Sequence, residues 1–68
     1  MAGLREITEM MLSRPGPHAP PPVVAAWYWR KADLLEALAS DGGPEAEWAN
    51  AQARLAREHA RALSERAA

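Results

Sequence analysis

Residues 38–46 read Leu38-Ala39-Ser40-Asp41-Gly42-Gly43-Pro44-Glu45-Ala46, and this stretch decides the fold. Glycine accepts the positive φ angle at which many helices end, and proline suits the first residue of a helix because its missing N–H costs nothing there. A short turn between two helices makes them antiparallel neighbours. The stretch therefore predicts a helical hairpin.

Both segments that flank this turn favour helix. We expect one helix from about 22 to 40, beginning at Pro22, and a second from about 44 to 66, beginning at Pro44. Glu45 and Glu47 in the first turn of the second helix suit the positive end of its dipole. The chain holds sixteen alanines and seven arginines, and both residue types are strong helix formers.

A third, shorter helix is expected at the N-terminus, from about 4 to 13. Leu4, Ile7 and Met11 recur at spacings of three and four, which marks one face of a helix. A linker at 15–22 follows, with five prolines in eight residues, a composition that favours a semi-rigid spacer in polyproline II geometry. The fold expected is thus all-α, a single small domain over 1–68. The first helix packs either on its own hairpin or on another chain.

Length and charge narrow the function. A chain of 68 residues rarely buries enough apolar surface to be stable alone, and without cysteine it has no disulfide or thiolate metal site to help. Oligomerisation or a protein partner is the supplement we expect. A net charge of −1 argues against nucleic acid and anionic membranes as general partners. No long apolar run or secretory signal is visible, so we expect a cytoplasmic protein.

The sequence of the middle helix predicts one apolar stripe. Two residues depart from this pattern, a lysine inside the stripe and a tryptophan opposite it. The stripe gathers Val24, Trp27, Leu34, Leu35 and Leu38. Lys31 falls inside it, where its stem packs and its ammonium reaches water, or where it fixes register with a partner. Trp29 projects nearly opposite the stripe. We expect it to be covered by the first helix or to anchor a partner.

The last helix has two apolar faces. One carries Trp48, Ala51, Leu55, Ala62 and Leu63, with His59 inside it as an expected half-buried polar residue. The other carries Ala49, Ala53, Ala56, Ala60 and Ala67. Small residues in that rhythm let another helix approach closely. The combined arc exceeds what one hairpin partner needs, so this helix is expected to have two neighbours.

No pattern indicates catalysis. His18 and His59 are far apart in sequence, and neither belongs to a recognisable metal motif. No nucleophile–base pair and no glycine-rich phosphate loop is present. The sequence therefore predicts no enzyme, no cofactor, no metal and no small-molecule substrate.

The stretch from Ala25 to Glu36, Ala-Ala-Trp-Tyr-Trp-Arg-Lys-Ala-Asp-Leu-Leu-Glu, is followed by an Ala/Arg-rich helix. In this it resembles short uncharacterised helical proteins of high-GC actinobacteria. The resemblance covers the hairpin half of the chain. It implies no function, so no functional residues are carried over.

The sequence thus predicts a non-catalytic helical protein–protein interaction module that self-associates as a homodimer or higher oligomer. One alternative is an accessory or regulatory subunit of a larger enzyme or transcription-factor complex. Another is a DNA-associated regulator that aligns Arg54, Arg57 and Arg61 in a dimer. The candidate interface residues are Met10, Met11, Trp29, Lys31, Ala49, Ala53, Leu55, Ala56, His59 and Ala60.

Overall fold

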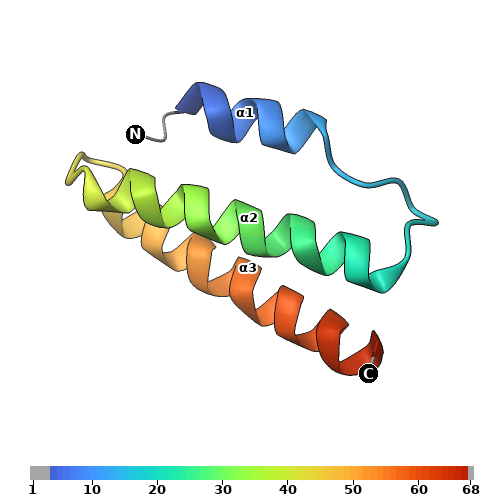
Figure 1. The fold of residues 1–68 in the computed structure, drawn as a ribbon. Helices are drawn as coiled ribbons and strands as arrows, with labels where there is room; N and C mark the ends of the chain where they lie inside the picture. The colour runs from blue at the N-terminus through green and yellow to red at the C-terminus, as the bar shows by residue number, and fades with distance from the viewer. Residues whose placement is uncertain (1–3, 68) are drawn as a thin grey trace.

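Three helices make up the computed structural model, which describes residues 4–67 (Figure 1). They are α1 (Leu4–Leu12), α2 (Pro21–Ser40) and α3 (Ala46–Ala67), and the described residues contain no strand. Helices α2 and α3 pack side by side as an antiparallel hairpin, and α1 lies against α2. The all-α fold with a hairpin and a short N-terminal helix is confirmed.

The turn between α2 and α3 uses its glycine as expected. Gly42 has a φ of 70°, and its N–H donates to the Ala39 carbonyl at 3.1 Å, which closes the end of α2. Pro44 is not the first residue of the third helix, as the sequence suggested. It lies inside a turn in which the Ala46 N–H donates to the Gly43 carbonyl at 3.0 Å, and α3 begins only at Ala46. Proline fits the second position of such a turn as well as the start of a helix.

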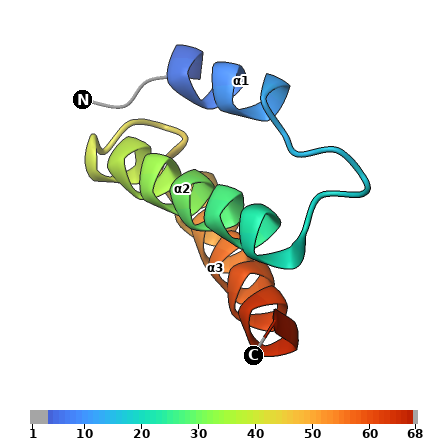
Figure 2. The same ribbon diagram turned by 45° about the vertical axis from the view of Figure 1, so that its right-hand side comes forward.

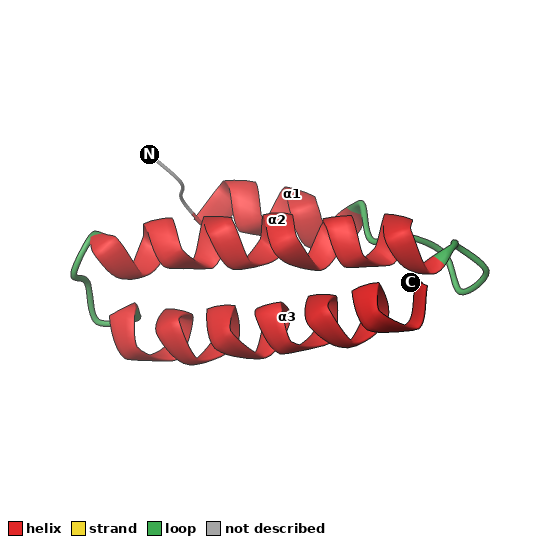
Figure 3. Cartoon of the chain, turned by 60° about the horizontal axis from the view of Figure 1, so that its bottom comes forward, coloured by secondary structure: helices red, strands yellow, loops and turns green. Residues whose placement is uncertain are grey.

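Helix α2 begins one residue earlier than expected, at Pro21. Pro21 and Pro22 are its first two residues, where a missing N–H leaves no bond unmade. The N–H groups of Val23 and Val24 both donate to the Pro20 carbonyl, at 3.0 and 3.2 Å. The linker before Pro20 forms an extended loop with one turn, and it returns the chain from the end of α1 to the start of α2 (Figure 3).

The hairpin is held by small side chains of α3 set against larger ones of α2. Four residues of α3 are fully buried, and all of them are alanines: Ala49, Ala53, Ala56 and Ala60. Alanine lets two helix axes approach closely, so the bulk of the core comes from α2, where Leu35 is the largest fully buried side chain. An ion pair between Glu36 of α2 and Arg57 of α3 joins the helices at one edge.

Helix α1 packs on its own hairpin, which answers a question that the sequence left open. Ile7 belongs to the same core cluster as Leu35 and Ala53. Met10 is buried, and its carbonyl accepts a hydrogen bond of 3.1 Å from the Trp27 indole N–H. The C-terminal half of α3 runs away from α1, so one flank of α3 stays uncovered (Figures 1 and 2).

Candidate protein interface

The alanine face of α3 is occupied within the chain. The sequence interpretation offered Ala49, Ala53, Ala56 and Ala60 as an interface for a partner helix. The structure places all four against α2, with almost no surface left exposed. A second chain cannot reach them without opening the hairpin. The alanine half of the predicted interface is therefore corrected to intramolecular core.

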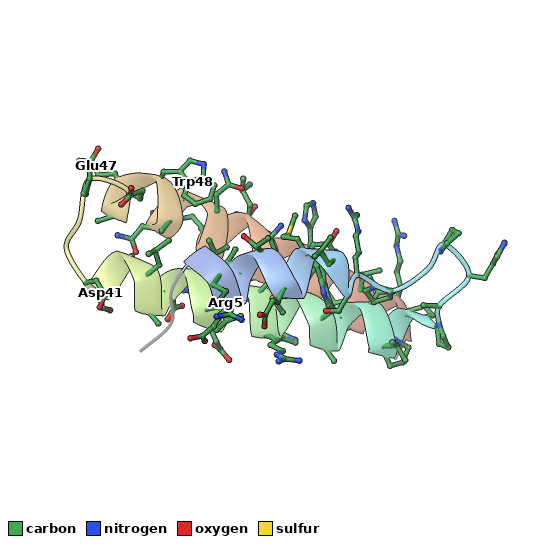
Figure 4. All side chains as sticks on the ribbon, turned by 90° about the horizontal axis from the view of Figure 1, so that it is seen from above. Arg5, Asp41, Glu47 and Trp48 are labelled. Carbon is green, nitrogen blue, oxygen red and sulfur yellow. The ribbon has the colours of Figure 1, made fainter. Side chains whose placement is uncertain are left out.

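The other apolar face of α3 points to solvent. Trp48 is 52% exposed and Leu55 is 48% exposed. They are seven residues apart, two helical turns, so they lie on one face. Figure 4 shows Trp48 projecting from the side of α3 close to the turn that joins it to α2. Large exposed apolar side chains on one face are typical of surfaces that bind another protein.

These two residues belong to a longer row, here called the outer seam. It runs along α3 at spacings of 4, 3, 4, 3 and 4 and consists of Trp48, Gln52, Leu55, His59, Ala62 and Arg66. That rhythm is the heptad spacing at which one helix packs along another. The buried alanines follow the same rhythm one residue later and are covered by α2. Trp48 was missing from the candidates drawn from the sequence, although this spacing would have identified it.

An apolar hollow lies beside the C-terminal half of the outer seam. It has a volume of about 280 Å³ and is lined by Val24, Tyr28, His59, Ala62, Leu63 and Arg66. His59 was expected to be half-buried but is exposed, and its ring packs on Tyr28 with 5.0 Å between centroids. The hollow is therefore formed by both helices of the hairpin, and it is open to solvent along the outer seam.

Lys31 has a local structural contact. Its Nζ lies 5.4 Å from the centre of the Trp27 ring and 5.9 Å from that of Tyr28, within the range of a cation–π interaction. Arg14 approaches the same two rings. Its Cζ lies 5.6 Å from the centre of the Trp27 ring, and its Nη2 donates a hydrogen bond of 3.3 Å to the Tyr28 hydroxyl. Arg14 thus joins the segment that follows α1 to α2, whereas the Lys31 contacts lie within α2.

The two neighbouring methionines of α1 have different surroundings. Met10 is buried against α2, whereas Met11 is 44% exposed. Met11 lies one turn after Ile7 on the same face of α1, and Ile7 belongs to a core cluster that includes residues of both other helices. Although Met11 shares a face with the buried Ile7, it is itself partly exposed, and only Met10 belongs to the core.

Trp29 stands apart from the outer seam. It is two residues after Trp27, so its side chain points about 160° away from the indole that binds α1. Helix α1 therefore does not cover it, and Trp29 remains 38% exposed. Of the two expectations from the sequence, coverage by the first helix is wrong.

The arginines of α3 share their surface with acids. Arg54, Arg57 and Arg61 line one surface hollow together with Glu58, and Arg57 also pairs with Glu36 of α2. Interleaved carboxylates weaken attraction to phosphate groups, because they repel the same anions that the arginines attract.

Two overall dimensions show that the chain is elongated. Its accessible surface is 4782 Å², whereas a compact monomer of 7.4 kDa exposes about 4,200 Å². Its radius of gyration is 12.3 Å, compared with about 11 Å for a compact chain of this length.

The described residues offer neither a metal site nor a membrane-spanning helix. No three His, Cys, Asp or Glu side chains there come together as a group suited to a metal ion. None of the helices over residues 4–67 combines the length and hydrophobicity needed to cross a membrane. Comparisons of the chain with protein-family models, curated proteins and solved structures give no match.

Proposed function

We propose that this protein is a non-catalytic helical interaction module that self-associates through the outer seam of α3. The observation that carries the proposal is the exposure of Trp48 and Leu55, about half of each, on one face of a helix whose other apolar face is already covered by α2. Tryptophan and leucine in water favour association, at roughly 25 cal/mol for each Å² of apolar surface buried.

The distribution of side chains in the hairpin supports the same proposal. The buried residues that α3 packs against α2 are alanines, while Trp48 and Leu55 are left about half exposed. A chain of this length that is stable as a monomer is expected to turn such residues inward, because its core is small. A second helix against the outer seam would supply the missing burial.

The test is the mass of the purified chain by light scattering across a concentration series. We expect a mass above 7.4 kDa that falls on dilution. Leu55→Asp is expected to give the monomer mass with helicity unchanged, because Leu55 takes little part in the hairpin core. Val23→Asp is the matched control, since Val23 is equally exposed (51%) but lies outside the outer seam.

The outcomes separate cleanly. A wild-type mass of 7.4 kDa at every concentration refutes self-association. Loss of helicity in Leu55→Asp would place Leu55 in the core instead of the interface. An equal loss of mass in both aspartate variants would mean that any added charge disperses the chain, and the outer seam would lose its special role.

A further inference from the structure

We infer that two copies pair through α3 in antiparallel orientation, with Trp48 of each copy inserted into the apolar hollow of the other. The inference rests on the proposed function and names the partner, the orientation and the contact. It combines an exposed indole at one end of the outer seam with an unfilled hollow at the other end.

The spacing of the outer seam suits this orientation. The intervals 4, 3, 4, 3 and 4 read the same in both directions, so two antiparallel copies align layer by layer. The layers that result are Trp48 with Arg66, Gln52 with Ala62, and Leu55 with His59, each formed twice. A two-fold axis then passes near the middle of α3, as in most homodimers.

This alignment brings the indole to the hollow. Trp48 of one copy lies beside Ala62, Leu63 and Arg66 of the second copy, three of the six residues that line the hollow. At about 280 Å³ the hollow falls just below the roughly 300–1,000 Å³ of small-molecule sites. It therefore suits one large side chain. The Arg66 guanidinium is well placed to contact the face of the indole as a cation–π pair.

Charge favours antiparallel over parallel pairing. Helix α3 carries Glu47 in its first turn and Arg66 in its last turn. Antiparallel copies bring these opposite charges together and oppose their helix dipoles, whereas parallel copies set Arg66 against Arg66. Near the two-fold axis, Glu58 of one copy comes close to Glu58 of the other copy. Arg54 and Arg61 line the same surface hollow as Glu58 and offset that repulsion.

The available area predicts a weak dimer. The contact is confined to one row of six residues on each copy, so we expect it to lie near the lower limit for specific interfaces, roughly 1,200 Å² in total. We therefore expect a dimer that dissociates on dilution.

A mixing experiment with two variants tests the contact. Trp48→Ala removes the indole but keeps the hollow, whereas Ala62→Trp fills the hollow but keeps the indole; Ala62 is exposed, so the fold tolerates the change. Each variant alone has lost both contacts of the dimer, and we expect dimerisation about a hundredfold weaker than wild type. An equimolar mixture regains one contact, so its dimerisation is expected to be only about tenfold weaker than wild type.

Sedimentation of the wild type, each variant and the mixture at one total concentration gives the result. A mixture no tighter than either variant, beside a dimeric wild type, overturns this inference and leaves the proposed function standing. A single variant that dimerises as strongly as the wild type also overturns this inference and leaves the proposed function standing. A wild type that is monomeric throughout overturns both.

Orientation has an independent test, because the chain contains no cysteine. Gln52→Cys and Ala62→Cys are mixed, oxidised and analysed by mass spectrometry. Antiparallel pairing predicts the mixed disulfide as the main product. Parallel pairing predicts the two symmetrical disulfides instead, and that result overturns the inference even if Ala62→Trp fails to fold.

Discussion

Replacing Trp27 with phenylalanine should release α1 while the hairpin stays folded. The Trp27 indole N–H donates a hydrogen bond of 3.1 Å to the Met10 carbonyl. Met10 is among the last four residues of α1, whose carbonyls have no partner within the helix. Phenylalanine keeps an aromatic ring but removes the donor. The Met10 carbonyl still accepts from Ser13, so it is not left without a partner.

The expected cost follows from these contacts. A net hydrogen bond contributes about 1 kcal/mol, and the lost area of the narrower ring adds about 1 kcal/mol more. A total of about 2 kcal/mol raises the population of the undocked α1 roughly 30-fold. Helices α2 and α3 share their own core and are joined by the Glu36–Arg57 pair, so they should be little affected.

Amide hydrogen exchange measured by NMR at fixed protein concentration gives the answer residue by residue. We expect amides at the end of α1 to exchange roughly 30-fold faster and those around Ala53 and Ala56 to change little. Trp29→Phe is the control, since Trp29 lies on the opposite side of α2 and is partly exposed. Equal acceleration in all three helices would refute the reasoning, because α1 would then unfold only together with the hairpin. No acceleration at all would show that the indole bond does not hold α1.

Three further substitutions test the hairpin by thermal denaturation. Ala53→Leu overpacks the contact with α2 and should cost about 1–3 kcal/mol, whereas Ala51→Leu, at an exposed position of the same helix, should leave the melting temperature the same or raise it. Gly42→Ala puts a side chain at a φ of 70° and should cost about 1 kcal/mol, or roughly 4–8 °C in a domain of this size. Gly16→Ala, where the φ is ordinary and the space open, should stabilise by a few tenths of a kcal/mol. Glu36→Gln removes a partly exposed ion pair and should cost less than about 1 kcal/mol, with the difference shrinking at high salt.

The parts of the fold that could be predicted depend on neighbours in sequence. Gly42 and Pro44 mark the turn wherever the helices go afterwards, and a short turn leaves two helices no arrangement except side by side. The exact start of α3 was missed by two residues because Pro44 fits the turn as well as a helix. The docking of α1 could not be predicted, since the spacing of Ile7 and Met11 marks a helix face without saying what covers it.

The same limit explains the error over the alanine face. Periodicity identified two apolar faces on α3 but could not say which one meets α2. The sequence interpretation gave Ala49 and Ala53 to a partner, on the expectation that small residues mark contact between chains. Packing inside the hairpin depends on fit between the two surfaces instead. Because α2 already contributes Leu35, the close approach of α3 requires alanines.

That choice of face has a consequence for association. The two apolar rows of α3 differ by one residue in register, so a rotation of the helix by about 100° would turn Leu55 toward α2 and expose Ala56 instead. The rotation would enlarge the hydrophobic core of an isolated chain but drive apart two helices now packed through alanine. The structure keeps the close packing and leaves Trp48 and Leu55 outside. Trp48 and Leu55 are thus placed where no helix of the same chain buries them, which is the arrangement that our proposal of self-association requires.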